Sequence, residues 1–256
     1  MLGVTDFLND AIADGRIKYA GFSFHDELAL FKEIVDAYDW TFCQIQYNFM
    51  DEQNQAGTEG LKYAADHDLG IVVMEPLRGG MLTKDIPAIN EIWKKAPAQR
   101  SLSEWGLRWV WNHPEVTVVL SGMSSFEQVR QNVAYAESGL PNSLSQEELN
   151  LFKDAETEYK KRIKVPCTGC RYYMPCTSNV SIPECFEMYN EGCMFDAPDA
   201  ASIKYNFVIG GMLTGILTGS PGFASQCEEC GDCEEKCPQG IPIREHLKKV
   251  ADYFGR

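Results

Sequence analysis

Four cysteines near the C-terminal end of this chain have the spacing of an iron–sulfur ligand set. Cys227, Cys230, Cys233 and Cys237 follow the pattern C-x2-C-x2-C-x3-C-P, which ends at Pro238. Three thiolates on one tight turn can each reach a different iron of a [4Fe–4S] cube. The fourth is displaced by one further residue and points away, and in proteins with two cubes it binds the other cube. The run therefore predicts a centre that moves electrons.

Zinc is the competing interpretation of this run, and free or regulatory thiols are a third. A structural zinc site is a tetrahedron around one ion, and its cysteines normally form two pairs separated by a longer loop. Here four thiols lie within eleven positions, which suits a cube better. Acidic side chains between the cysteines should lower the reduction potential of a cluster; they are Glu228, Glu229, Asp232, Glu234 and Glu235.

Composition and charge limit the class of protein. A net charge of −14 over 256 residues argues against nucleic acid and anionic membranes as partners. Nine of the ten cysteines lie between Cys167 and Cys237, and only Cys43 lies in the first half. Residues 1–14 are acidic and amphipathic, unlike a signal peptide. The apolar run 207–217 is interrupted by glycines and is too short to span a bilayer. These features predict a cytoplasmic protein.

Before the cysteines, short apolar runs alternate with helical patterns. The predicted strands are residues 16–22, 41–47, 70–74 and 116–120, and the predicted helices are residues 26–37, 58–67, 101–112 and 125–137. Nearly continuous apolar strands separated by helices indicate a parallel sheet covered by helices. Ser125, followed three residues later by Gln128, is a capping-box signal for the last helix.

The pattern changes at about residue 145, where a charged amphipathic helix is predicted over residues 145–164. Beyond it the sequence predicts only short helices around the cysteines, at residues 181–190, 199–218 and 241–254. We therefore predict an α/β domain at residues 1–144, a connecting helix at 145–164 and a small all-α domain at 165–256.

Four segments of the first domain occur in the order of a known family. They are Gly15-Arg16-Ile17-Lys18-Tyr19-Ala20-Gly21-Phe22-Ser23, Gln44-Ile45-Gln46-Tyr47-Asn48, Met74-Glu75-Pro76-Leu77-Arg78-Gly79-Gly80, and Leu120-Ser121-Gly122-Met123 running into Gln131-Asn132. This part resembles the second half of an aldo/keto reductase barrel. The whole layout resembles oxidoreductases in which such a barrel carries a C-terminal ferredoxin-type 4Fe-4S domain. The resemblance implies NAD(P)H as cofactor and a small-molecule carbonyl or alcohol as substrate.

The resemblance also implies that the barrel is partial. A TIM-type (β/α)8 barrel has eight strand–helix units in about 250 residues, but only four predicted strands precede the helical domain. The family's catalytic aspartate, tyrosine, lysine and histidine belong to the other half, so no residue here is predicted to be catalytic. The chain is expected to be part of a longer enzyme and to lack carbonyl reductase activity alone.

The same resemblance implies contacts to the cofactor. Ser23 and Gln44 would contact the nicotinamide amide, and Gln131 and Asn132 the adenosine side. The start of the last helix would offer backbone N–H groups to phosphate through Gly122, Met123, Ser124 and Ser125.

The family's usual basic residues for a 2′-phosphate are replaced here by Gly122 and Gln128, so NAD and NADP both stay open. Arg78 is the nearest other cation. It would serve a phosphate or a carboxylate substrate, or simply form a surface salt bridge.

A second cysteine run contains Cys167, Cys170 and Cys176, with Tyr173 where the resembling proteins have a further cysteine. By the resemblance, Cys176 would complete the cube held by Cys227, Cys230 and Cys233, and Cys237 would join Cys167 and Cys170. This second site has only three thiolates. It would hold a [3Fe–4S] cluster, recruit Cys185 or Cys193, use the Tyr173 phenolate, or stay empty.

Two hypotheses about function remain open. In the first, the chain is part of an oxidoreductase in which a nicotinamide site moves hydride and a cluster relays single electrons to or from an electron-transfer partner. In the second, it is an electron-transfer or structural iron–sulfur module on a non-catalytic scaffold. In either case an open half-barrel exposes two sheet edges, which predicts a homodimer or association with the missing half.

Overall fold

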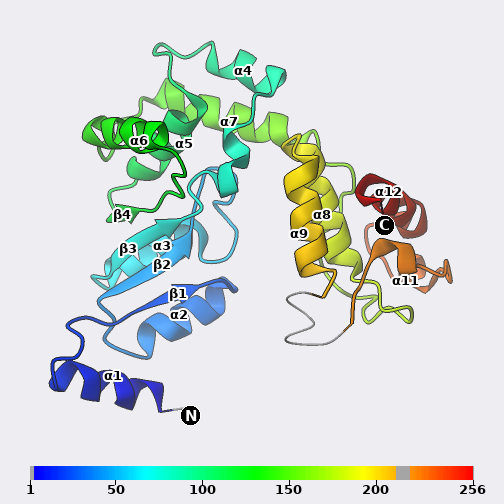
Figure 1. The fold of residues 1–256 in the computed structure, drawn as a ribbon, viewed down its shortest axis with the longest axis horizontal. Helices are drawn as coiled ribbons and strands as arrows, with labels where there is room; N and C mark the ends of the chain where they lie inside the picture. The colour runs from blue at the N-terminus through cyan, green and yellow to red at the C-terminus, as the bar shows by residue number, and fades with distance from the viewer. Residues whose placement is uncertain (1–2, 212–219, 256) are drawn as a thin grey trace. The chain divides into compact units, whose positions relative to one another are not determined.

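The structure of the protein is a computed structural model, which describes residues 3–211 and 220–255. The chain divides into two compact units, one of Met1–Thr83 with Ile92–Glu156 and one of Lys84–Glu91 with Thr157–Arg256. Among the described residues, the first unit holds four strands and the second contains helices but no strand (Figure 1). The division crosses the chain within α4 (Pro87–Trp93) and again within α7 (Gln146–Lys160).

The first unit is built on a parallel sheet with the strand order β1-β2-β3-β4. Its strands are β1 (Gly21–Phe24), β2 (Phe42–Gln46), β3 (Gly70–Met74) and β4 (Val118–Val119). Phe42 is aligned with Gly21 on one side and with Gly70 on the other. Parallel neighbours need a crossover between them, and helices supply it here. The predicted α/β fold with a parallel sheet is confirmed.

The helices of this unit alternate with the strands along the chain. They are α1 (Val4–Ala13), α2 (Leu28–Asp36), α3 (Gly57–Asp66), α5 (Leu102–Trp111) and α6 (Phe126–Ser138), with a 3-10 segment η1 (Arg78–Thr83). Ile45 and Ile71 in the strands and Phe31 in α2 are fully buried, so they form the core between sheet and helices. Apolar residues on both layers hold the sheet in place.

The first predicted strand, residues 16–22, was wrong over most of its length. The chain turns at Gly15, which has φ 78°, and Ile17 N–H donates to the carbonyl oxygen of Ala11 at the end of α1. Asp14 accepts hydrogen bonds from the backbone N–H and the guanidinium of Arg16. These contacts hold residues 14–17 against α1, so pairing with β2 begins only at Gly21.

The fourth predicted strand, residues 116–120, is shorter than expected. Val116 N–H donates to His113 in a turn, whereas Thr117 N–H and Leu120 N–H donate to Ile71 and Val73 of β3. The connection between β3 and the helix predicted at residues 101–112, for which the sequence indicated no element, contains η1 and α4. Short helices of this kind are set by packing rather than by a periodic pattern.

An aromatic cluster packs beside the sheet. The rings of Trp93 and Trp105 stack with centroids 5.0 Å apart. Phe152 of α7 lies 4.9 Å from the ring of Trp93 and 5.3 Å from that of Phe49, in edge-to-face contacts. Such pairs add to the free energy gained from burying the rings.

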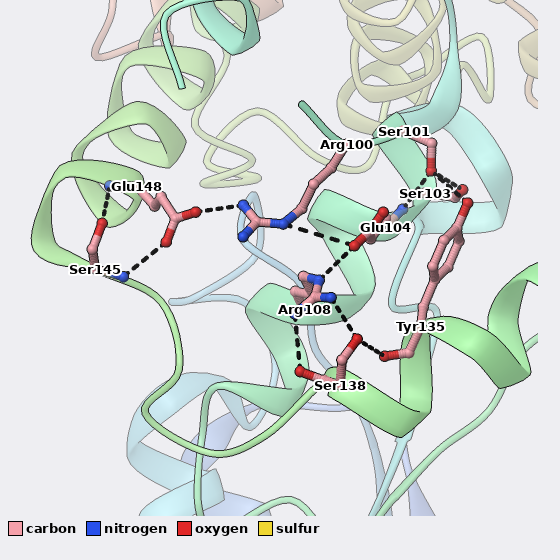
Figure 2. A network of polar contacts seen from close by, with 9 residues as sticks. All are labelled: Arg100, Ser101, Ser103, Glu104, Arg108, Tyr135, Ser138, Ser145 and Glu148. Atoms are coloured by element: carbon pink, nitrogen blue, oxygen red, sulfur yellow. Dashed lines mark hydrogen bonds and ion pairs between the residues drawn. The ribbon is translucent and has the colours of Figure 1, made fainter. Parts of the chain in front are cut away.

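A network of charged side chains joins α5 to α6 and α7 (Figure 2). Glu104 accepts a hydrogen bond from Arg108 at 2.7 Å, and Arg108 also donates to the carbonyl oxygen and the hydroxyl of Ser138 in α6. Arg100 pairs with Glu148 in the first turn of α7. This network ties α5 to the end of α6 and to the start of α7.

The second unit is a helical cluster of α8 (Ile182–Met194), α9 (Pro198–Val208), the 3-10 segment η2 (Ala224–Gln226), α11 (Asp232–Glu235) and α12 (Ile243–Phe254). Phe186 and Val250 are fully buried in its core, and the rings of Tyr205 and Phe254 stack with centroids 4.0 Å apart. Five cysteines pack at the edge of this core: Cys167, Cys176, Cys227, Cys233 and Cys237.

The helix predicted over residues 199–218 was too long within the described part, since α9 ends at Val208. Gly210 and Gly211 follow in a turn, with φ 86° at Gly211, and Gly222 N–H donates to Ile209. Residues 212–219, which complete the predicted helix and the apolar run 207–217, lie outside the described residues. Among the helices that are described, none has the length and apolar character needed to cross a bilayer.

Candidate cofactor pocket and cysteine cluster

A cavity of about 570 Å³ opens in the first unit where β3 and β4 end. Its walls are the segment after β3, from the loop (Glu75, Pro76 and Leu77) and from η1 (Gly79, Gly80 and Thr83), the loop after β4 (Leu120, Ser121, Gly122, Met123 and Ser124), and Ser103, Gln128, Gln131 and Asn132 from α5 and α6. This volume is in the range of small-molecule and cofactor sites. The carboxyl ends of parallel strands are where open α/β folds bind ligands.

Five of the residues expected to contact a cofactor line this pocket: Gly122, Met123, Ser124, Gln131 and Asn132. The structure leaves three others outside the lining. Ser125 caps α6, Ser23 is exposed on β1, and Gln44 is half-buried on β2 with its Nε2 3.5 Å from the sulfur of Met74. Asn132 donates to the hydroxyl of Ser121 at 3.0 Å, which orients its amide at the pocket wall.

The start of α6 already has acceptors for part of its backbone. The predicted capping box is confirmed, because Gln128 N–H donates to Ser125 Oγ and the Gln128 side chain accepts from Ser125 N–H. The same Oε1 accepts from Ser124 N–H at 2.8 Å. An incoming phosphate would therefore have to replace the Gln128 oxygen at these two N–H groups.

The pocket wall contains one carboxylate, Glu75, and its lining residues include no lysine, arginine or histidine from the described chain. Arg78, expected to serve a phosphate or carboxylate, instead donates to Asp51 Oδ1 at 2.6 Å. Asp51 is buried, and its other oxygen accepts from the amides of Gln46 and Asn48. Arg78 therefore forms a salt bridge, but with a buried carboxylate and not at the surface as the sequence suggested.

Sequence reasoning missed the part of the wall that follows β3. Gly79 and Gly80 have φ of 61° and 88°, a conformation that favours glycine, and both line the pocket. Gly79 and Gly80 lie in a segment that carried the family resemblance. This Gly-Gly pair was the sequence signal that could have identified this part of the pocket wall. Ser103 had no signal, because its place at the pocket depends on how α5 packs.

The second unit has a small cavity of about 60 Å³ among its cysteines. Cys176, which precedes α8, and Cys227, Cys230 and Cys233, around α11, line this cavity together with Tyr173. We call these four cysteines the first cysteine group. They are the same four cysteines that, by the family resemblance, would hold one cube.

The thiols of the first group lie close enough to affect one another. Burial, with smaller contributions from the charges of Glu234, Cys227 and Cys230, raises the pKa of the Cys233 thiol to about 11. Two of the surrounding carboxylates are neutralised, because Glu234 pairs with Arg244 at 2.7 Å and Glu229 with Lys248 at 2.8 Å. Not all five acidic neighbours therefore add unpaired charge near these thiols.

The other three expected ligands gather around Tyr173. Its hydroxyl lies 3.8 Å from Cys167 Sγ. Burial raises the pKa of Tyr173, and Cys167, Cys237 and Cys170 raise it further through their charges. We call Cys167, Cys170 and Cys237 the second cysteine group.

Cys185 and Cys193 do not line the cavity of the first group. Cys185 is fully buried, with its sulfur 3.8 Å from Tyr205 Oη, and burial raises its pKa to about 12. Burial also raises the pKa of Cys193, beside Tyr189. All ten cysteines are free thiols. In residues 3–211 and 220–255, no three histidine, cysteine or acidic side chains converge on a point where one metal ion would be held.

A comparison with known proteins identifies the family of the first unit. Residues 1–157 match the Aldo/keto reductase family. Aldo-keto reductase AKR11C1 from Bacillus halodurans (holo form) is 23% identical, with a TM-score of 0.49 over 59% of this chain and 54% of that one. An aldo-keto reductase from Klebsiella pneumoniae in complex with NADPH is 21% identical, with a TM-score of 0.46 over 58% and 51%. The chain thus spans about half the length of these structures. No curated protein matches it.

Proposed function

This chain belongs to the aldo/keto reductase family, and from that premise we propose that its first unit binds NAD(P)H in the pocket at the ends of β3 and β4. The observation that carries the proposal is that five residues expected to contact a dinucleotide line this one pocket. The bound nicotinamide would supply hydride transfer between a small carbonyl and its alcohol. The chain's own residues bind and orient the dinucleotide.

The adenosine side of the dinucleotide would meet Gln131 and Asn132, and its phosphates would meet the backbone around Met123 and Ser124. Glu75 is an acceptor for ribose hydroxyls in the same wall. The absence of a lysine or arginine among the described lining residues favours a ligand without a 2′-phosphate, because that dianion needs a charged partner.

The parallel sheet is one half of a (β/α)8-type barrel in this proposal. Four strands in sequential order, each followed by helical structure, support it. No residue of this half is given a catalytic role. A second half, from another chain or from a second copy, would cover the open edges at β1 and β4.

The second unit binds a [4Fe–4S] cluster through Cys176, Cys227, Cys230 and Cys233. The spacing of the cysteines and the shared cavity support this. A cube takes one thiolate at each iron, so its ligands stand farther apart than those of a single ion. When bound, the cluster would supply one-electron transfer to or from a partner protein. A cytoplasmic location, where thiols stay reduced, fits this chemistry.

A second candidate function is a structural or electron-transfer module without its own reductase chemistry. It is favoured by the packing of Cys167, Cys176 and Cys227 against the core of the second unit. Metal binding at such a position contributes directly to the free energy of folding. Unfolding of the second unit upon cluster removal, without any NAD(P)H binding by the protein, would select this function.

The dinucleotide proposal is tested by titrating the purified chain with NADH and NADPH and following ligand fluorescence. We expect Asn132→Ala to weaken binding about fivefold through loss of a hydrogen bond. Asn150→Ala, on the exposed side of α7, is the matched control and should bind as the wild type does. No binding of either dinucleotide by the wild type would refute the proposal.

The cluster proposal is tested by iron and acid-labile sulfide analysis after purification without oxygen. We expect about four of each per chain, and near-complete loss in Cys227→Ser. Cys185→Ala is the control, because this buried thiol packs in the core away from the cavity. Wild-type protein without iron would overturn the cluster assignment.

A further inference from the structure

We propose that Tyr173 blocks the second cysteine group, so that this chain holds one [4Fe–4S] cluster rather than two. This inference rests on the proposed cluster at the first group, and it concerns a different set of thiols. It makes a tyrosine, rather than a missing loop or domain, the determinant of the number of clusters.

Tyr173 lies between the two cysteine groups. Its side chain is buried, with 6% of the residue exposed, and its hydroxyl is 3.8 Å from Cys167 Sγ. The same residue lines the cavity of the first group beside Cys176 and Cys233. One ring therefore separates the space available to the first group from the thiols of the second.

The second group provides three thiols, whereas a complete cube has four irons. Thiolates are the ligands that iron–sulfur clusters prefer, and a phenol oxygen is a much harder donor. The Tyr173 hydroxyl already shares a hydrogen bond with Cys167 Sγ, so this contact occupies a thiol instead of adding a ligand.

The ring of Tyr173 also fills the volume that a second cluster would need. Tyr173 belongs to the buried core of the second unit, together with Val165, Ile182 and Leu247. A cysteine side chain is several atoms smaller and ends in a thiol. Tyr173→Cys would therefore remove the ring from this space and supply the fourth thiolate in a single change.

The alternatives at Cys185 and Cys193 offer no replacement ligand. Cys185 has its sulfur against Tyr205 Oη and the carbonyl oxygen of Gly222, inside the core. Neither cysteine lines the cavity of the first group.

The test is iron and sulfide content of the whole chain, purified and reconstituted without oxygen, with electron paramagnetic resonance of the reduced protein. Wild type and Tyr173→Phe should each contain about four irons, and Tyr173→Cys about eight, a twofold increase. The reduced cysteine variant should also show the spectral broadening of two interacting clusters. Tyr173→Phe is the matched control, since it keeps the ring and removes only the hydroxyl.

Each other outcome is decisive. About eight irons in the wild type, or about seven with a [3Fe–4S] signal, would overturn the inference while leaving the cluster at the first group intact. A folded Tyr173→Cys protein that stays at about four irons would also overturn it. If this variant does not fold, the wild-type stoichiometry still decides: about four irons agrees with the inference, and about eight, reduced to about four in Tyr173→Phe by loss of a phenolate ligand, overturns it. Absence of iron from every variant would instead refute the cluster proposal itself.

Discussion

Arg100, just before α5, and Glu148, in the first turn of α7, form an ion pair between side chains that are only 16% and 7% exposed. Glu148 also accepts from the backbone N–H of Ser145, and its own N–H donates to Ser145 Oγ, which completes a cap at the start of α7 (Figure 2). One carboxylate thus both starts a helix and fixes it to α5.

Arg100→Ala should destabilise the chain by about 3 kcal/mol, because it leaves the carboxylate of Glu148 buried without its cation. Urea unfolding at neutral pH measures the change. Arg130→Ala is the matched control: its pair with Glu127 is 68% and 53% exposed, and its loss should leave the free energy of unfolding nearly unchanged. Equal losses in both variants would contradict the role given to burial.

The stability provided by Glu148 should depend on pH. Burial by itself would raise the pKa of Glu148, but the Ser145 N–H and the Arg100 guanidinium outweigh it and lower this pKa below its ordinary value of 4.5. A lowered pKa stabilises the folded state above about pH 4.5, and the contribution is lost as the pH falls through the folded value.

This dependence is isolated by comparing wild type with Glu148→Gln, because every other carboxylate is common to both. The difference in their free energies of unfolding should be largest at pH 7 and should shrink as the pH falls below about 4.5. A difference that stays constant from pH 7 to the acid range would exclude the charge of Glu148 as the cause.

Phe152→Ala should destabilise the first unit by about 3–5 kcal/mol, since the ring is 3% exposed and its removal opens a cavity among Phe49, Trp93 and Trp105. Tryptophan fluorescence during unfolding reports on the same cluster. Phe126→Ala, at 83% exposure on α6, should change stability by no more than about 0.5 kcal/mol.

Gly122→Arg should make the chain select NADPH over NADH. A Cβ atom at Gly122 would meet no heavy atom within 4 Å, and Gly122 lines the pocket, so a longer side chain can start from this position. One charge-assisted contact to the 2′-phosphate should improve NADPH affinity about tenfold and leave NADH affinity nearly unchanged. Gln53→Arg adds the same charge at an exposed position outside the pocket lining. If Gln53→Arg changes the affinity for NADPH as much as Gly122→Arg does, long-range attraction is responsible and not a contact in the pocket.

The sequence was most informative where one local pattern decides the structure. The run 70–74 forms β3 with the predicted limits, because a fully apolar strand has few other places in a folded chain. Ser125 and Gln128 form the predicted capping box, which needs only two residues three positions apart.

Contacts between distant segments explain what the sequence did not reveal. The apolar residues at 16–22 suggested a strand, but the backbone N–H groups of Arg16 and Ile17 donate to Asp14 and Ala11 and not to a neighbouring strand. The sequence offers Arg78 as a cation for a ligand, because nothing in it shows that the buried carboxylate of Asp51 accepts a hydrogen bond from Arg78. The occupation of Ser124 N–H by Gln128 and the position of Tyr173 between two cysteine groups likewise depend on side-chain placement that no spacing encodes.

Cys176 and Cys227 border one cavity although about fifty residues separate them along the chain. Any group that bonded to both sulfurs would cross-link the polypeptide and close a loop of that length. Closing such a loop in the unfolded chain removes conformational entropy worth about 3.5 kcal/mol, on a (3/2)RT ln n scale. Filling this cavity would therefore stabilise the second unit by restricting its denatured ensemble, and the yield of folded protein in a cell would follow the supply of inorganic cofactor.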